Sequence, residues 1–125
     1  MINLLAVGAG GFLGAVLRYL AGLLPVGQPA GFPLTTFCIN LLGSFLIGFV
    51  SQFAALRQTA GAPLTLFLKV GLCGGFTTFS TFALENVTLI NENRTGTALL
   101  YMILSFCACI AGAAAGSALA RAAGG

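Results

Sequence analysis

Long runs without a charged side chain constrain this chain more than any other feature. No Asp, Glu, Lys or Arg occurs in residues 1–17, 19–56 or 95–120. Only 6% of the 125 residues are charged and 58% are hydrophobic, whereas a soluble domain has about a quarter charged residues. Five basic and two acidic side chains do not cover a globular surface. The sequence therefore predicts an all-α protein whose helices cross a lipid bilayer.

Turn-forming residues divide the apolar sequence into four segments. Prolines and glycines alternate in residues 25–33, Gly61 and Pro63 mark a second turn, and residues 91–94 read Asn-Glu-Asn-Arg. No basic residue precedes the first segment, so we expect it to be a retained helix and not a signal peptide. Because a membrane-spanning helix needs roughly 20 apolar residues, we predict one domain, residues 1–125, with helices at about 3–24, 34–56, 64–90 and 96–120.

Composition also excludes several classes of function. The formal charge of +3 is small and scattered along the chain, so a nucleic acid is not an expected partner. The absence of histidine removes the usual catalytic triads and the commonest metal ligand. The four cysteines lie in apolar segments without C-x-x-C spacing, which favours a packing role. We therefore do not expect an enzyme.

Small residues recur at four-residue spacing, which permits close approach of helix backbones in lipid. The positions are Gly10 and Gly14, Gly71 and Gly75, and Ala108, Gly112, Gly116 and Ala120. These stripes predict helix packing. Four helices enclose little interior, so a pathway through the protein is more easily built between two copies.

The basic residues are nearly balanced between the two ends of the predicted helices. With four spans, Arg57 and Arg121 share the side of the N-terminus, whereas Arg18 and Arg94 lie toward the other side. Assigning Lys69 to the first side changes the count only from two against two to three against two. The positive-inside rule needs a clear bias to fix orientation. We therefore expect insertion in both orientations, which permits an antiparallel homodimer.

The centre of the predicted third helix is a poor helix interior. Gly74 and Gly75 are followed by the β-branched Thr77 and Thr78. A break there would lie near the bilayer centre, where irregular backbone is tolerated only if it is buried in protein or lines a cavity. Freed carbonyls of broken helices coordinate cations in transporters. The alternative is an unbroken helix with a tight Gly-Gly contact, and the pattern alone leaves both open.

Several polar and aromatic side chains fall within the predicted spans. The carboxamide of Asn40 is costly in lipid unless it bonds a partner helix, water or a ligand. Glu85 is the one acidic residue inside a span; it is either functional or close enough to the helix end to reach the interface. Phe79 and Phe82 share a helix face, and phenylalanines in a membrane helix more often pack or face lipid than form a site. Arg18 and Lys69 are typical of interfacial charges.

On the fourth helix, Tyr101, Ser105 and Cys109 lie at i, i+4 spacing and can form a polar track. Such a track, together with the Gly-Gly-x-Thr-Thr centre, has three interpretations. The first is an ion pathway. The second is a small four-helix multidrug exporter. Such exporters depend on a glutamate in helix one, whereas the first predicted helix of this chain has no acidic residue. The third is an assembly subunit of a membrane complex, which leaves Asn40 without a task.

Three segments resemble the signatures of the Fluc/CrcB family of fluoride channels. They are GGFLGAVLRY at residues 10–19, NLLGSFLIG at residues 40–48, and GGFTTFSTF at residues 74–82. The resemblance implies a dual-topology antiparallel homodimer with two fluoride pores and a third helix broken near its middle. It also implies a structural sodium ion on the two-fold axis, held by the main-chain carbonyls of Gly74 and Thr77. We expect a β-branched side chain at Gly75 to obstruct close backbone approach at that axis.

The resemblance also assigns roles to side chains. It implies pore positions for Asn40, Phe79, Phe82 and Tyr101, and a vestibule position for Arg18. The hydroxyls of Ser80, Thr81 and Ser105 are the expected additional donors. The sequence departs from the family pattern at Cys109 and Ala113, where further hydroxyls are usual, and at Lys69, where the family is usually neutral.

A fluoride pathway needs donors of this kind because fluoride is a small, strongly hydrated anion. A dry pore must replace the water with neutral hydrogen-bond donors and the positive edges of aromatic rings. Conduction also requires weak, multi-site binding. We therefore expect a channel in the bacterial inner membrane that exports fluoride passively and lowers cytoplasmic fluoride. Its expected partners are fluoride, a second copy of the chain, and lipid.

Overall fold

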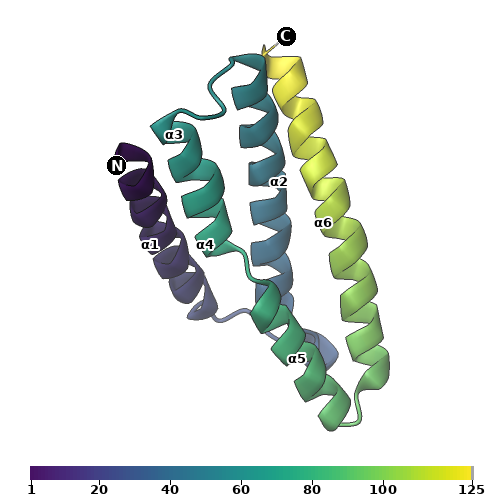
Figure 1. Cartoon of the computed structure of the whole chain (residues 1–125). Helices are drawn as coiled ribbons and strands as arrows, with labels where there is room; N and C mark the ends of the chain where they lie inside the picture. Colours follow the sequence, from purple (N-terminus) through teal and green to yellow (C-terminus); the bar gives the residue numbers. More distant parts are fainter. Residues whose placement is uncertain (125) are drawn as a thin grey trace.

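The computed structural model describes residues 1–124, and all of its regular elements are helical (Figure 1). Their bounds are α1 Ile2–Gly22, η1 Pro29–Gly31, α2 Leu34–Leu56, α3 Pro63–Leu66, η2 Phe67–Cys73, α4 Gly74–Phe76, α5 Phe79–Asn91 and α6 Thr95–Gly124. Helices α1, α2 and α6, together with the segment Pro63–Asn91, are each long and apolar enough to cross a membrane. This confirms the prediction of four membrane-spanning helices.

Prolines and left-handed residues determine where several helices begin and end. Pro33 precedes α2, and Pro63 occupies the first turn of α3, where a proline loses no intrahelical hydrogen bond. Gln58 and Asn93 have positive φ angles of 56° and 61°, which turn the chain after α2 and α5. α6 continues to Gly124, four residues past the predicted end at 120, because Ala and Arg in residues 121–124 favour the helix.

The spans form two tightly packed pairs (Figure 1). In the first pair, α2 lies against α6, and a Cβ at Gly116 would collide with the carbonyl of Phe45. A Cβ at Gly48 would likewise collide with the carbonyl of Ala113. Ala120 on the same stripe of α6 is completely buried. The predicted small-residue packing of the fourth helix is therefore confirmed.

In the second pair, α1 lies against η2 and α4, and the two glycine pairs of the sequence contact each other. A Cβ at Gly71 would lie 2.7 Å from the Cα of Gly10, and a Cβ at Gly14 would overlap Leu72. Gly75 belongs to the same contact, because its Cβ would lie 2.6 Å from the carbonyl of Gly11. Gly75 therefore makes a close backbone approach to α1 within one chain. Its expected approach at a dimer axis stays a prediction.

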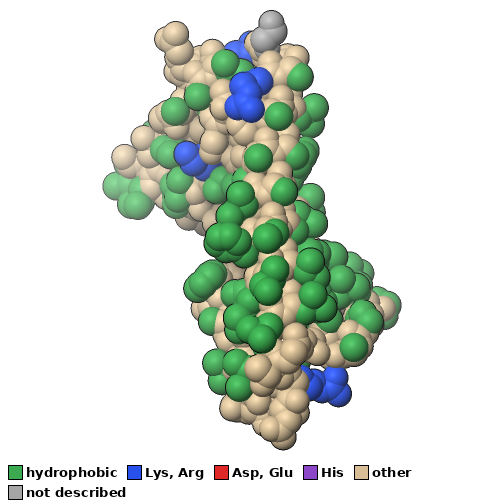
Figure 2. All heavy atoms as spheres, turned by 90° about the vertical axis from the view of Figure 1, so that its right-hand side faces the viewer, with side chains coloured by type: hydrophobic (Ala, Val, Ile, Leu, Met, Phe, Trp, Pro, Cys, Tyr) green, Lys and Arg blue, Asp and Glu red, His purple; other side chains and the backbone are tan. Residues whose placement is uncertain are grey.

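Most apolar side chains point outward. At most 17% of the most hydrophobic window in any span is buried inside the protein. Phe12 on α1 and Ile103 on α6, for example, are 73% and 60% exposed. Figure 2 shows hydrophobic side chains over the middle of one face and Lys or Arg side chains toward its two ends. Lipid is the solvent that such a surface requires.

The connections place both termini and the loop after α2 at one end of the bundle (Figure 1). The loop before α2 and the hairpin between α5 and α6 lie at the opposite end. There, Arg94 Nη1 donates to the Ala30 carbonyl at 3.0 Å and joins the hairpin to η1. Helix α5 departs from the line of α4 and runs toward this end.

Candidate functional site

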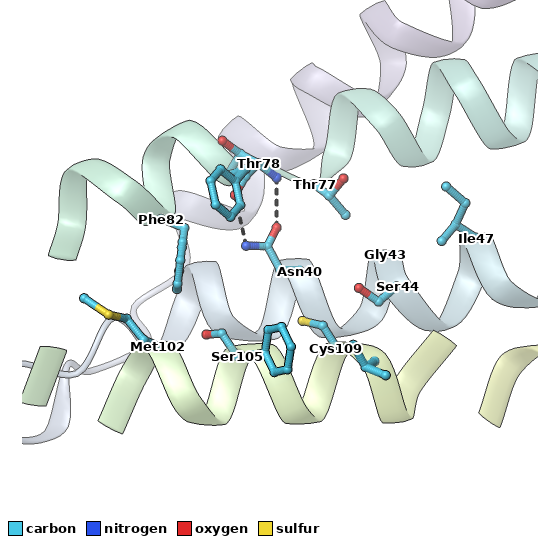
Figure 3. A pocket seen from close by; sticks show the side chains of 13 residues that line it. Asn40, Gly43, Ser44, Ile47, Thr77, Thr78, Phe82, Met102, Ser105 and Cys109 are labelled. Carbon is cyan, nitrogen blue, oxygen red and sulfur yellow. Dashed lines mark hydrogen bonds between the residues drawn. The ribbon is translucent and has the colours of Figure 1, made fainter. Parts of the chain in front are cut away.

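Two residues with extended backbone separate α4 from α5. Thr77 has φ −80° and ψ 156°, and Thr78 has φ −149° and ψ 122°. The side chain of Asn40 on α2 bonds both backbone groups of Thr78 (Figure 3). Asn40 Nδ2 donates to the Thr78 carbonyl at 3.0 Å, and the Thr78 N–H donates to Asn40 Oδ1 at 2.8 Å. Asn40 thus supplies the partners that an uninterrupted helix would have supplied.

The geometry of Thr77 and Thr78 also redirects the neighbouring hydrogen bonds. The Thr78 hydroxyl caps α5 by accepting from the Thr81 N–H at 3.1 Å. In a continuous helix the N–H groups of Thr78 and Thr81 would bond the carbonyls of Gly74 and Thr77. Because those N–H groups are directed to side chains, the carbonyls of Gly74 and Thr77 lose their helical donors. These are the two carbonyls for which the sequence resemblance implied a cation.

Arg18 on α1 bonds a backbone carbonyl that lies between these two in the sequence. Its Nε donates to the Gly75 carbonyl at 3.2 Å, and the side chain is half-buried. Arg18 is therefore tied to the centre of the bundle and does not simply extend to the interface. Lys69 on η2 is exposed at the surface of the chain.

A groove of ≈ 630 Å³ lies between α2, the start of α5, and α6 (Figure 3). Its lining residues are Asn40, Gly43, Ser44, Ile47, Thr77, Thr78, Phe79, Phe82, Met102, Ser105, Phe106, Cys109 and Ile110. None of these lining side chains is charged. The structure thus brings together Asn40, Phe79, Phe82 and Ser105 of the predicted pore positions, along with Cys109 of the predicted polar track.

Two phenylalanine rings form one wall of the groove. The centroids of Phe79 and Phe82 are 5.5 Å apart with an interplanar angle of 41°. Phe79 is 80% exposed in a single chain. The ring of Phe82 is held from behind by Tyr101, with centroids 4.9 Å apart. Tyr101 is completely buried and does not line the groove.

The carboxylate of Glu85 joins three elements below these rings. It accepts hydrogen bonds from the Tyr101 hydroxyl on α6 and from the Thr36 hydroxyl on α2, each at 2.9 Å. Both oxygens of Glu85 are therefore occupied by protein donors. The arrangement fixes Tyr101, and through it the ring of Phe82.

The remaining predicted hydroxyls lie outside the groove of a single chain. Ser80 is exposed, and its oxygen lies 3.4 Å from the Thr78 hydroxyl. Thr81 is half-buried at the start of α5 and does not line the groove. Ala113 belongs to the contact between α2 and α6 and not to the groove.

Comparison with known proteins places the chain in a family. The family described as CrcB-like protein, Camphor Resistance (CrcB), matches residues 5–117. The chain belongs to the CrcB-like family. It is 43% identical over 122 residues to a protein of Ruminiclostridium cellulolyticum named "Fluoride-specific ion channel FluC", covering 97% of this chain and 94% of the relative. Proteins of the same name from Chlorobaculum tepidum and Rhizobium meliloti are 45% and 44% identical, over 96% and 98% of their lengths.

Family membership confirms the resemblance that the three sequence segments indicated. The relatives are named as ion channels, a class of proteins that are not enzymes, in agreement with the sequence-based expectation. With four apolar helices, this CrcB-like chain is a multi-pass bacterial membrane protein.

Sequence reasoning missed two contributors to the site in this CrcB-like chain. Thr36 lies one helical turn before Asn40 and bonds Glu85, and Ser44 lies one turn after Asn40 and lines the groove. The i, i+4 spacing of these three residues on α2 was the available signal. It marks the same face of α2 as the one that contacts Thr78.

Proposed function

We propose that the chain is a fluoride channel that lets fluoride leave the cytoplasm passively, down its own gradient. The observation that carries this proposal is the groove of uncharged donors and phenyl rings between α2, α5 and α6. The names of the relatives add direct support. A cationic side chain in such a groove would bind an anion too tightly, whereas conduction needs several weak sites.

Neutral donors remain free for an anion in this groove. The amide nitrogen of Asn40 carries two hydrogens, and the Thr78 carbonyl takes one of them. Ser105 is 93% buried, with 7% of its surface exposed, and its hydroxyl has no partner among residues 1–124. The ring edges of Phe79 and Phe82 carry the positive part of the aromatic quadrupole. Together these groups can replace the water of a fluoride ion.

The functional unit that we propose is an antiparallel homodimer. One side of the groove is open in a single chain, since Phe79 and Phe106 are 80% and 69% exposed. A second copy would close this side, and the balance of basic residues between the two ends permits it to insert upside down. Each dimer would then contain two equivalent pathways.

The dimer proposal is tested by fixing the orientation of the copies. Two lysines added next to the N-terminus should orient every copy the same way and abolish flux. Co-expression with a variant that carries its added lysines in the loop between α1 and α2 should restore flux. Normal flux from copies of one proven orientation would refute the antiparallel arrangement.

We also propose that a sodium ion stabilises the dimer through the carbonyls of Gly74 and Thr77. Their helical donors are directed elsewhere, and an unpartnered carbonyl in hydrocarbon costs several kcal/mol. Neutral carbonyl oxygens suit a hard cation of low charge. The ion is structural, so flux needs no sodium gradient. Dimers purified in sodium should withstand heating better than dimers in choline, and equal resistance would contradict the proposal.

The channel proposal itself is tested by reconstitution. Purified protein in fluoride-loaded liposomes should release fluoride as soon as a counter-ion pathway is opened, and a fluoride electrode follows the release. Liposomes without protein give the baseline. A proton-coupled exporter would instead require a proton gradient, and the absence of any release would reject the channel.

A further inference from the structure

The thiol of Cys109 lies in the groove, next to an unsatisfied buried hydroxyl. Cys109 is a half-buried free cysteine on α6, one helical turn beyond Ser105. Figure 3 shows both side chains on the face of α6 that is turned toward α2. Ser105 is 7% exposed and its oxygen has no hydrogen-bond partner in the described chain. A buried polar group without a partner calls for a ligand or ion in the same space.

We infer that Cys109 is a binding site for soft metal ions within the groove and that occupation of this site blocks the pathway. The inference rests on the proposed function, because it takes the groove to be that pathway. Sulfur is the ligand that soft metals prefer, whereas the neighbouring oxygen donors suit hard ions. Mercuric chloride is an uncharged molecule, so no charge need be desolvated when it enters this uncharged groove.

The reaction is a ligand exchange at mercury and needs no oxidant. The sulfur of Cys109 forms a bond to mercury in HgCl₂, one Hg–Cl bond breaks, and the chloride leaves as an anion. The thiol proton passes to the buffer. Mercury keeps its oxidation state, and a soluble dithiol removes it by the reverse exchange. The product, a bulky S–Hg–Cl group, lies between α6 and α2.

The other three cysteines provide matched controls because none of them lines this groove. Cys38 and Cys107 are exposed on the outer surface of the bundle. Cys73 is buried, 3% exposed, and lines a separate apolar groove of ≈ 270 Å³ with α1 and α2 residues. Mercury bound at Cys38 or Cys107 leaves the space between α2, α5 and α6 unchanged.

The experiment measures fluoride efflux from liposomes before and after HgCl₂ is added. Wild-type protein and the C38S/C107S variant should both lose nearly all flux and regain it with dithiothreitol. C109S should keep its own starting rate in mercury, whatever that rate is. Equal loss of flux in C109S, or no loss in the wild type, would overturn the inference.

Intact-mass measurement in detergent tests binding without flux. After treatment with HgCl₂, C38S/C107S should carry one more mercury atom per chain than C38S/C107S/C109S. An equal mercury content in the two variants would overturn the site. If the untreated protein moves no fluoride at all, the proposed function fails, while this measurement still decides whether Cys109 binds the metal.

Discussion

Replacing Asn40 by leucine should destabilise the fold through the backbone of Thr78. The change removes two hydrogen bonds, from Asn40 Nδ2 to the Thr78 carbonyl at 3.0 Å and from the Thr78 N–H to Asn40 Oδ1 at 2.8 Å. Leucine has the same branched arrangement of side-chain heavy atoms and is not smaller than asparagine, so the change leaves no cavity. A fully buried group left without a partner costs about 1–3 kcal/mol. Because both hydrogen bonds are part-buried, we expect the lower end of this range for each, or about 2 kcal/mol for the pair.

A loss of this size is large for any domain, since about 2 kcal/mol already changes the ratio of folded to unfolded protein by about 30-fold. The assay is heating in detergent followed by size-exclusion chromatography, with the midpoint of loss compared between variants. Ser44→Ala is the matched control, because Ser44 lies on the same face of α2 and makes no hydrogen bond to another described residue. If Asn40→Leu melts with the wild type and with this control, Asn40 does not hold Thr78 in place.

Three further predictions concern the rings, the glycine contact and the carboxylate. Phe79→Ile and Phe82→Ile should fold normally, because apolar volume is largely kept, but should lower fluoride efflux; full efflux in both would assign the rings to packing. Gly14→Val should reduce the yield of folded protein, because its Cβ would lie 2.8 Å from a backbone nitrogen of α4. Gly8→Val adds a side chain into open space and should behave as wild type. Similar yields of the two variants would refute the contact. Glu85→Leu leaves the hydroxyls of Thr36 and Tyr101 without an acceptor, whereas Glu85→Gln keeps one acceptor oxygen. Glu85→Leu should therefore lower the melting midpoint more than Glu85→Gln. The reverse order would show that the carboxylate does not organise the site.

Much of the architecture was predictable from the sequence because lipid imposes a simple rule. Backbone groups in lipid have to be bonded internally, and uncharged segments of about 20 residues have the length of a membrane-spanning helix. The small-residue stripes also identified the helix faces that contact each other, as at Gly71 and Gly116. What the stripes did not specify is which faces meet within one chain. The contact of Gly75 with α1, for example, was not predicted from its motif.

The site was predictable at the level of residue types and less so at the level of geometry. Adjacent positions in a motif point in different directions once α5 begins at Phe79, and Ser80 is therefore exposed while Phe79 lines the groove. The bonds from Thr36 and Tyr101 to Glu85 join residues 49 and 16 positions apart, and no local pattern specifies them. Such contacts follow only from the packing of α2, α5 and α6.

The central claim is that the uncharged groove selects and conducts fluoride, and parallel efflux of fluoride and chloride tests it most directly. One preparation of purified protein is reconstituted into two sets of liposomes, loaded with potassium fluoride or potassium chloride, and valinomycin opens the potassium pathway. The account predicts rapid fluoride release from the first set and chloride release at the rate of protein-free liposomes from the second. Comparable release of both anions, or fluoride release no faster than from protein-free liposomes, would contradict it.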